Sequence, residues 1–306
     1  MRRCQRCGQK AVVYLPQHRL SLCKEHYIEW YLKRVESTIR EFKMFGKDDR
    51  VLVAVSGGKD SLSLWDALCR LGYTADGLYI DLGIGEYSQK SKKACENFAQ
   101  KKGLRLHVLE LKREIASIPE IKEVERNRPA CSFCGLLKRY YMNRFAREGG
   151  YKVIATGHNL DDESATLLSN VLSWNMGYLS RQFPVLLEGE GFVRKVKPLV
   201  KFTEKENALY AFLSGIEYVE EECPFSEGAS SIEYKKTLAQ MEEKSPGTKL
   251  RFYMDFLRRL HPILQTQEVE LRPCKVCGEP TTAEVCSVCR LKERVIPKLL
   301  SSSPSS

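Results

Sequence analysis

The chain has 306 residues, of which 43% are hydrophobic, so it can bury one substantial core and still carry smaller modules. Lys and Arg number 49 against 39 Asp and Glu, and the net charge of +10 favours a polyanionic partner, although a basic solvated surface explains it equally well. No stretch approaches the roughly 20 consecutive apolar residues of a membrane span and the start lacks a signal peptide's apolar core, so we expect a cytoplasmic protein without membrane contact.

The N-terminal residues contain four candidate metal ligands in two pairs. Cys4-x-x-Cys7 is separated by a fifteen-residue loop from Cys23-x-x-His26. Each pair can grip one ion from a tight turn, and four soft ligands that include thiolates suit tetrahedral Zn²⁺. Free thiols in turns are the alternative. We predict a zinc finger at residues 1–27.

Beyond this module the pattern becomes helical and then rich in β-strands. A connecting helix is expected over residues 28–50. Short apolar runs then alternate with helical stretches, in the order VLVAV, GLYID, LRLHVLEL and KVIATGH. This alternation is typical of a parallel sheet built from right-handed βα units. An α/β domain is therefore expected over residues 51–225.

The first strand runs into a glycine-rich loop, SGGKDS, at residues 56–61. A Walker loop would need Gly five residues before Gly58 and Ser or Thr after the lysine, whereas this chain has Val53 and Asp60 there. Backbone N–H groups at such a turn, together with the N-terminus of the next helix, can still bind an anion. We expect Asp60 and Ser61 to cap that helix. A tight βα turn that happens to contain two glycines is the alternative.

The complete string after an apolar strand resembles the PP-loop, SGGxDS, of the ATP pyrophosphatases. In that family the loop binds the pyrophosphate end of ATP, the bond between the α and β phosphates is broken, and the product is an adenylated substrate. The resemblance implies a doubly wound parallel sheet of the adenine nucleotide alpha hydrolase type. It also implies a nucleotide site formed by Ala54, Ser56, Gly57, Gly58, Lys59, Asp60, Ser61, Ile80 and Gly157.

Two further segments can converge with this loop. The strand in LYIDLGIGEYS ends at Ile80, and ATGHNLDDE places Gly157, Asp161 and Asp162 after a later strand. Ligands of open α/β sheets bind at the carboxyl ends of strands. Paired carboxylates beside a triphosphate are natural Mg²⁺ ligands, although ordinary capping of a helix N-terminus by acidic residues is the alternative.

Five cysteines lie between the two terminal groups. Cys69 and Cys95 stand beside apolar residues in helical patterns, so we expect both in the core. Cys131-x-x-Cys134 precedes a helix, and Cys223 precedes a proline. Three cysteines suit a [4Fe-4S] cluster with one iron left free. A redox dithiol at the C-x-x-C pair and a mixed zinc site remain alternatives.

The C-terminal part begins with residues 226–270, which look helical and mixed in charge and are interrupted by SPG at 245–247. Residues 296–306, which end in SSSPSS, are expected to form a disordered tail.

Between these segments lies a second cysteine group. Cys274-x-x-Cys277 and Cys286-x-x-Cys289 offer four thiolates at short separation, which suits a second structural Zn²⁺. We predict a zinc ribbon at residues 271–295.

The PP-loop, the paired terminal zinc modules and the central C-x-x-C with its distant Cys-Pro together resemble the tRNA 2-thiouridine synthetases of the TtuA type. The similarity covers nearly the whole chain, from Cys4 to Cys289. It implies that ATP converts the C2 oxygen of a tRNA uridine to an O-adenylate and that sulfur then replaces it. The expected target is 5-methyluridine 54 of the T loop, and the wobble uridine 34 is the alternative.

The resemblance also implies roles for particular residues. A [4Fe-4S] cluster on the three central cysteines would bind hydrosulfide at its free iron and deliver it. Lys138 matches a family lysine expected at the α-phosphate or at the charge developing on the base, unless it is a plain surface lysine. Asp162 is the first choice for Mg²⁺ binding or base positioning, and Asp161 the second.

Expected partners are tRNA, a ubiquitin-like sulfur carrier with a C-terminal thiocarboxylate, and a second copy of the chain. The target base must leave its stack to react, and residues 226–270 with the two zinc modules are the expected tRNA surface. Two other classes are less consistent with the sequence. An ATP pyrophosphatase that amidates a metabolite has no use for the three further cysteines, and a non-catalytic zinc-ribbon protein would bind tRNA without releasing pyrophosphate.

Overall fold

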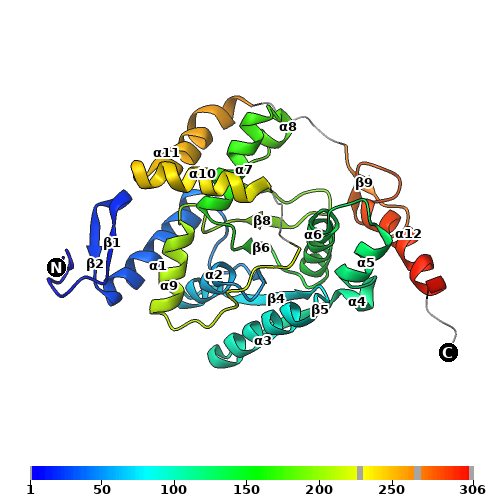
Figure 1. Cartoon of the computed structure of the whole chain (residues 1–306), viewed down its shortest axis with the longest axis horizontal. Coiled ribbons are helices and arrows are strands. Elements are labelled where there is room, and N and C mark those ends of the chain that lie inside the picture. Colours follow the sequence, from blue (N-terminus) through cyan, green and yellow to red (C-terminus); the bar gives the residue numbers. More distant parts are fainter. Residues whose placement is uncertain (1, 226–229, 265–269, 303–306) are drawn as a thin grey trace.

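The computed structural model describes residues 2–225, 230–264 and 270–302. A six-stranded sheet of order β5-β4-β3-β6-β8-β7 forms its centre (Figure 1). Neighbouring strands are parallel except β7, which runs antiparallel to β8. The predicted parallel α/β sheet is therefore confirmed, while the short β8-β7 edge was not anticipated from the sequence. The strands are β3 (Val51–Val55), β4 (Ala75–Asp81), β5 (Leu106–Glu110), β6 (Val153–Thr156), β7 (Val185–Leu186) and β8 (Arg194–Val196).

Helices cover both faces of this sheet because successive side chains of a strand point to opposite sides. Val51, Val53 and Val55 pack in one core cluster, whereas Leu52 belongs to the other. The first cluster includes buried residues of α1 (Lys24–Glu41), α2 (Lys59–Arg70), α3 (Gly85–Lys102) and α9 (Glu204–Leu213). The second includes those of α4 (Leu111–Glu114), α5 (Ile118–Val124), α6 (Ala130–Glu148) and α12 (Ser287–Ser302). The sheet is thus doubly wound.

A helical layer packs on α7 (Leu160–Leu172) above the sheet (Figure 1). It contains α8 (Met176–Leu179), α10 (Ser230–Lys244), α11 (Thr248–Asp255), a π-helical turn at Phe256–Leu260 and a 3₁₀ turn at His261–Ile263. The predicted break at 245–247 separates α10 from α11. The outer parts of the predicted region, 226–229 and 265–269, lie outside the described residues.

The two cysteine-containing modules lie at opposite ends of the molecule (Figure 1). The first is a hairpin of β1 (Val13–Leu15) and β2 (Leu20–Leu22), joined by a 3₁₀ turn at Pro16–His18 and followed directly by α1. The second pairs β9 (Arg272–Pro273) with β10 (Pro280–Thr281) and continues into α12. No helix in the described part of the chain is long and apolar enough to cross a membrane.

Two predicted boundaries differ from the structure. The connecting helix begins at Lys24 rather than at 28 and ends at Glu41, well before 50. The prediction of a disordered tail from 296 is wrong for residues 296–302, which extend α12. The helix continues there because Leu299 packs against the core cluster that contains α5 and α6. Residues 303–306 lie outside the described part of the chain.

Candidate active site at the carboxyl edge of the sheet

A cavity of about 350 Å³ lies where β3, β4 and β6 end. Parallel strands present their carboxyl ends at one edge of a sheet, so the loops that follow them meet there. Much of the predicted nucleotide site lines this cavity, together with two of the residues predicted for chemistry. These residues are Ala54, Ser56, Asp60, Ser61, Ile80, Lys138, Gly157 and Asp162.

The glycine loop has a conformation that its sequence explains. Gly57 has φ +79°, and a Cβ atom there would lie 2.6 Å from the carbonyl oxygen of Ser91. The hydroxyl of Ser61 accepts from the backbone N–H of Ser56 at 3.1 Å and donates to the carbonyl of Gly58 at 3.0 Å. The expected capping of α2 by Asp60 and Ser61 is therefore wrong, because Ser61 turns back into the loop. Gly58 is the N-cap, and within the described residues no side chain caps the first turn of α2, which leaves that turn suited to an anion.

Two polar residues orient the carboxylate of Asp60. Its Oδ1 accepts hydrogen bonds from Asn207 Nδ2 at 2.7 Å and from Asn159 Nδ2 at 3.2 Å. Lys59 lies 3.4 Å from the same carboxylate and 2.6 Å from Glu204. Burial raises the pKa of Asp60 despite these partners. The loop thus presents one fixed carboxylate and one lysine beside the helix N-terminus.

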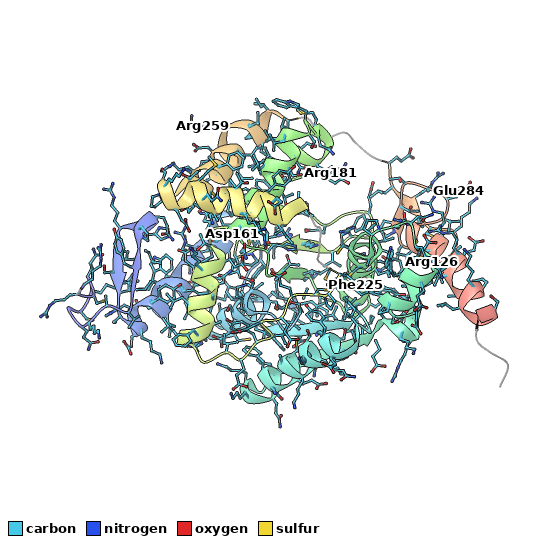
Figure 2. The ribbon with its side chains drawn as sticks, viewed as in Figure 1. Arg126, Asp161, Arg181, Phe225, Arg259 and Glu284 are labelled. Atoms are coloured by element: carbon cyan, nitrogen blue, oxygen red, sulfur yellow. The ribbon has the colours of Figure 1, made fainter. Side chains whose placement is uncertain are left out.

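The adjacent Asp161 and Asp162 have different surroundings. Asp161 is buried away from the cavity, where it pairs with Lys249 at 2.5 Å and accepts from the backbone N–H of Glu204 at 2.8 Å. Figure 2 labels Asp161 below α10. Asp162 lines the cavity and pairs with Lys235 of α10 at 2.5 Å. Burial alone would raise the pKa of Asp162, but the ammonium of Lys235, together with the backbone N–H of Asn159 and the ring of His158, outweighs burial and lowers it.

The three central cysteines come together at the first turn of α6. Cys131 is exposed, and its thiol donates to the carbonyl of Phe225 at 3.1 Å, so the segment after Cys223 lies against α6 (Figure 2). Burial raises the pKa of Cys134, and the other two thiols raise it further. Cys134 lies one turn before Lys138, which lines the cavity.

The three central cysteines do not have the close spacing of a zinc site. Thiolates around one Zn²⁺ lie about 3.8 Å apart, since the Zn–S distance is about 2.3 Å and the geometry is tetrahedral. In the described part of the chain, only the two terminal groups have all their ligand atoms within 4.8 Å of one another. A wider arrangement of three thiols fits a larger cluster better than a single ion.

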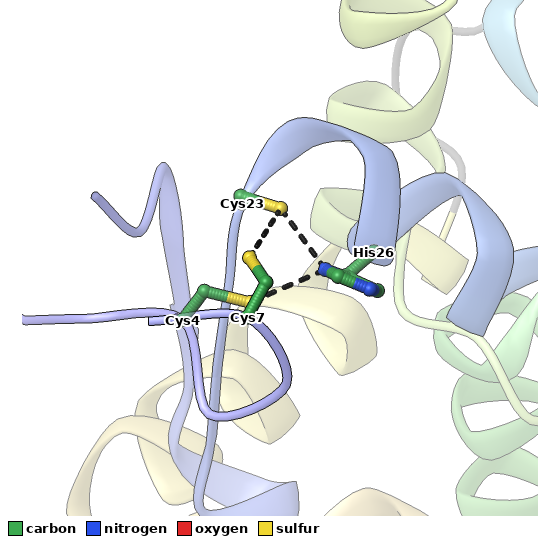
Figure 3. A group of neighbouring side chains, drawn as sticks. All are labelled: Cys4, Cys7, Cys23 and His26. Carbon is green, nitrogen blue, oxygen red and sulfur yellow. Dashed lines mark hydrogen bonds between the residues drawn. The ribbon is translucent and has the colours of Figure 1, made fainter. Parts of the chain in front are cut away.

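The N-terminal group has the compactness of a single-ion site (Figure 3). Cys7 Sγ lies 3.8 Å from Cys23 Sγ, which is 3.2 Å from His26 Nδ1. His26 Nδ1 is also 3.5 Å from Cys4 Sγ. Because α1 begins at Lys24, its first turn holds His26 against the thiols of the three cysteines. The four side chains fit one tetrahedral metal ion.

The C-terminal group has the same form. Cys277 Sγ and Cys286 Sγ are 3.7 Å apart, and all four sulfur atoms lie within 4.8 Å of one another. Cys274 Sγ accepts from the backbone N–H of Cys286 at 3.2 Å, and Cys289 lies in the first turn of α12. A backbone N–H that donates to a sulfur atom fixes the direction in which that thiolate can bind a metal ion. This set also fits one tetrahedral ion.

Several lining residues were not predicted from the sequence, among them Tyr87, His158 and Lys195. His158 Nδ1 is 2.9 Å from Thr156 Oγ1, and burial lowers its pKa. Its position directly after Gly157, at the end of a predicted strand, was a signal that could have found it. Lys195 stands on β8, a three-residue strand with no clear sequence signature.

Comparisons with known families agree with this geometry. The model described as "2-thiouridine synthetase TtuA, N-terminal LIM domain" matches residues 3–28, and the PP-loop domain model matches residues 31–227. Together they include the first metal group, the glycine loop and the three central cysteines.

Similar proteins are named for tRNA thiolation. The tRNA-5-methyluridine(54) 2-sulfurtransferase of Thermus thermophilus is 50% identical, with 95% of this chain and 91% of the relative aligned. Its namesake from Thermotoga maritima is 48% identical, with 96% and 97% aligned. The U34-tRNA thiolase NcsA from Methanococcus maripaludis, solved with its [4Fe-4S] cluster, has a TM-score of 0.82 at 26% identity and covers 96% of this chain and 97% of its own.

Proposed function

The chain belongs to the TtuA-type PP-loop family of tRNA thiolation enzymes, and we propose that it is an ATP-dependent sulfurtransferase that converts 5-methyluridine 54 of tRNA to its 2-thio form. One observation carries this function. A single cavity is lined by the glycine loop, Lys138 and Asp162, and the three central cysteines approach α6 one turn away from Lys138. The phosphate-binding end thus lies in the cavity, and the proposed sulfur-binding cysteines lie next to its Lys138 wall.

The chemistry requires two steps because the C2 oxygen of uracil is a poor leaving group. In the first step this oxygen attacks the α-phosphorus of ATP, and the bond to the departing pyrophosphate breaks. In the second step sulfur adds at C2, the C2–O bond breaks, and AMP leaves with the oxygen. The first turn of α2 and Lys59 bind the phosphates, and Lys138 stabilises negative charge that develops next to the base.

Magnesium is assigned to the carboxylates that line the cavity. Mg²⁺ takes one or two carboxylates together with phosphate oxygens. Asp60 and Asp162 both line the cavity, whereas Asp161 is paired elsewhere, so the first two are the proposed ligands. Binding of the ion requires Lys235 to give up its ion pair with Asp162.

The sulfur end is assigned to Cys131, Cys134 and Cys223. A [4Fe-4S] cluster held by these three thiolates would supply an open iron site for hydrosulfide. The first turn of α6 presents two of the thiols, and the contact between Cys131 and Phe225 brings the segment of the third against it. These residues place incoming sulfur next to Lys138 and away from the glycine loop.

The partners follow from the same function. We assign tRNA as the substrate, a ubiquitin-like protein with a C-terminal thiocarboxylate as the sulfur donor, and a homodimer as the assembly. The expected tRNA surface at 226–270 is reduced by the structure, because Lys235 and Lys249 are engaged with Asp162 and Asp161. The two terminal metal modules, assigned one Zn²⁺ each, and exposed basic residues such as Arg258 and Arg259 remain for this role.

The choice of nucleotide rests on the relatives. Those named for 5-methyluridine 54 are 42–50% identical to this chain, whereas the tRNA 2-thiolation protein NcsA of Haloferax volcanii is 31% identical. Both reactions use the same chemistry, so the choice of 5-methyluridine 54 follows the higher identity of those relatives.

The test is a thiolation assay on protein purified without oxygen and reconstituted with iron and sulfide. Wild type should thiolate tRNA only when both ATP and the cluster are present, and Cys223→Ala should lose this activity. Cys69→Ala, which removes a thiol at the far end of α2, serves as the matched control and should keep it. Digestion of the product tRNA locates the thiolated base.

Each alternative has its own outcome in this assay. Equal thiolation by iron-free Cys223→Ala would refute the cluster and point to a persulfide or disulfide at Cys131 and Cys134. If the product tRNA carries sulfur at nucleotide 34, the assigned target is wrong but the enzyme class stands. Binding of tRNA without release of pyrophosphate would contradict catalysis altogether.

A further inference from the structure

Lys195 lies on β8 and points toward the helix that carries Lys138. In the parallel register Lys195 pairs with Ile154 of β6, which belongs to the core cluster on the face of α6. The next residue, Val196, belongs to the opposite cluster. Because side chains alternate along a strand, Lys195 leaves the sheet on the α6 face, where Lys138 and Met142 line the same cavity.

The ammonium of Lys195 makes no direct contact with a carboxylate in the described part of the chain, although the nearby charge of Glu163 favours its protonated form. Among residues 2–225, 230–264 and 270–302 it makes neither an ion pair nor a hydrogen bond, whereas Lys197, two residues further, pairs with Glu163 at 2.8 Å. Burial, followed by repulsion from Lys197 and Arg139, lowers the pKa of Lys195 to about 8. A half-buried ammonium without a direct partner is costly, so this position is suited to an anionic ligand.

The position of Lys195 in the cavity indicates which phosphate of the substrate its ammonium can bind. The glycine loop and Lys59 form one side of the site, and Glu204 and Asp60 already neutralise Lys59. Lys138 and Lys195 are the two lysines among the residues that line the cavity, and Lys138 lies one turn from Cys134. They therefore face the part of the cavity where sulfur must meet the activated base.

We propose that Lys195 is a further substrate-binding residue of the thiolation reaction, whose ammonium binds the phosphate that joins the activated uridine to adenosine. This inference rests on the proposed function. After pyrophosphate has left, that phosphate carries one negative charge, and it gains a second when the C2–O bond breaks and AMP departs. An ammonium beside it stabilises the charge that develops during sulfur transfer. Lys138 from α6 and Lys195 from β8 then hold the adenylate from two elements.

The titration of Lys195 gives this site a characteristic pH dependence. The charged groups facing it are Lys197 just after β8, Arg139 on α6 and Glu163 on α7, and His158 and Asp162 line the same cavity. Lys195 is charged below pH 8 and loses its proton as the pH rises through that value. Affinity for the phosphate of AMP should therefore be greatest at neutral pH and fall above pH 8.

The test uses AMP as the probe and measures its affinity for the reconstituted full-length protein at pH 7 and pH 9. Lys195→Met should weaken AMP binding at pH 7 by about tenfold, the effect of losing one charge-assisted hydrogen bond. Lys195→Arg should restore most of the affinity and, because a guanidinium keeps its charge, should lose much less of it at pH 9 than wild type. Lys152→Met, which removes an exposed lysine just before β6, is the matched control and should bind AMP as wild type does.

Thermal unfolding separates a binding role from a structural one. Lys195→Met replaces an unpaired ammonium by an apolar side chain of similar length, so its Tm should equal or exceed that of wild type. A lower Tm, or unchanged AMP binding in Lys195→Met, or the same loss at pH 9 in Lys195→Arg as in wild type, would overturn the inference. If wild type binds AMP as described but never thiolates tRNA, the phosphate site stands and the proposed function fails.

Discussion

The side-chain amide of Asn207 donates a hydrogen bond of 2.7 Å to the carboxylate of Asp60. The same amide accepts a hydrogen bond of 2.7 Å from the hydroxyl of Tyr31. Asn207 is fully buried, so α1, which leads out of the N-terminal metal module, is connected to a carboxylate of the cavity by two hydrogen bonds in the interior.

Replacing Asn207 by Leu should impair both stability and nucleotide use. The change leaves two buried polar groups without one partner each, which costs about 1–3 kcal/mol per group. Asp60 would also lose a donor that favours its charged form, so its already raised pKa should rise further and its affinity for a cation should fall. Urea unfolding and the KM for ATP in the thiolation assay measure the two effects.

Tyr31→Phe is the matched control for this variant. It removes the hydroxyl that donates to Asn207 but leaves the bond between Asn207 and Asp60 intact, so it should cost about 1–3 kcal/mol of stability and leave the KM for ATP unchanged. An equal rise of KM in both variants would mean that nucleotide use responds to general destabilisation and not to Asp60.

The terminal cysteine groups should each bind one zinc ion. Metal analysis of the full-length protein should give about two equivalents of zinc, and Cys7→Ser and Cys277→Ser should each retain one. Each substitution should also lower the Tm, because a structural zinc ion adds its binding free energy to folding. Cys69→Ser should keep both equivalents, and retention of two zinc ions by Cys277→Ser would contradict the site.

Local spacing explains why these metal groups and the glycine loop could be predicted. Cys4 and Cys7, or Cys274 and Cys277, occupy single turns whose geometry depends on neighbours in sequence. Gly57 needs a left-handed backbone inside one loop. Features of this kind depend on neighbouring residues and can be recognised within a short window of the sequence.

Residues brought to the site from distant elements could not be predicted in the same way. Lys195 reaches the cavity from a three-residue strand, and Asn207 approaches Asp60 from α9, 147 positions away. Asp161 and Asp162 are identical neighbours, and only the helix geometry that begins at the N-cap Asn159 turns one into the cavity and the other into the interior.

A pH dependence of stability is expected at the junction between the N-terminal module and α9. The buried carboxylate of Glu206 accepts a hydrogen bond from Gln17 at 3.0 Å and lies 3.1 Å from His18. It also accepts a hydrogen bond from the backbone N–H of Thr203. Burial alone would raise the pKa of Glu206, but His18, the backbone N–H of Thr203 and Arg34 together outweigh burial and lower it.

A carboxylate whose pKa is lowered by folding stabilises the protein above its unfolded pKa, about 4.3, and this stabilisation disappears as the pH falls through its folded pKa. Glu206→Gln should therefore be less stable than wild type at pH 7 by about 1–3 kcal/mol, and the difference should shrink below about pH 4. Urea unfolding of both proteins from pH 3 to pH 7 measures this. A difference that is constant over that range would mean that the charge of Glu206 contributes nothing.

Comparing Gly57 with Gly72 separates the effect of backbone strain from the effect of steric contact. Gly57 and Gly72 both have φ +79°. A Cβ atom at Gly57 would lie 2.6 Å from the carbonyl oxygen of Ser91, whereas at Gly72 it would have no atom within 4 Å. Both alanine variants carry the cost of a left-handed residue, about 1–2 kcal/mol, but only Gly57→Ala must displace the glycine loop from α3.

Gly57→Ala should therefore reduce tRNA-dependent release of pyrophosphate at least tenfold, because a small displacement of the phosphate-binding loop misplaces the α-phosphorus. Gly72→Ala should lose a similar part of its free energy of unfolding to backbone strain, as measured by urea unfolding, but should keep the rate of pyrophosphate release. If both variants lose activity in proportion to their stability, the loop does not act through its position, and the anion site assigned to the first turn of α2 is wrong.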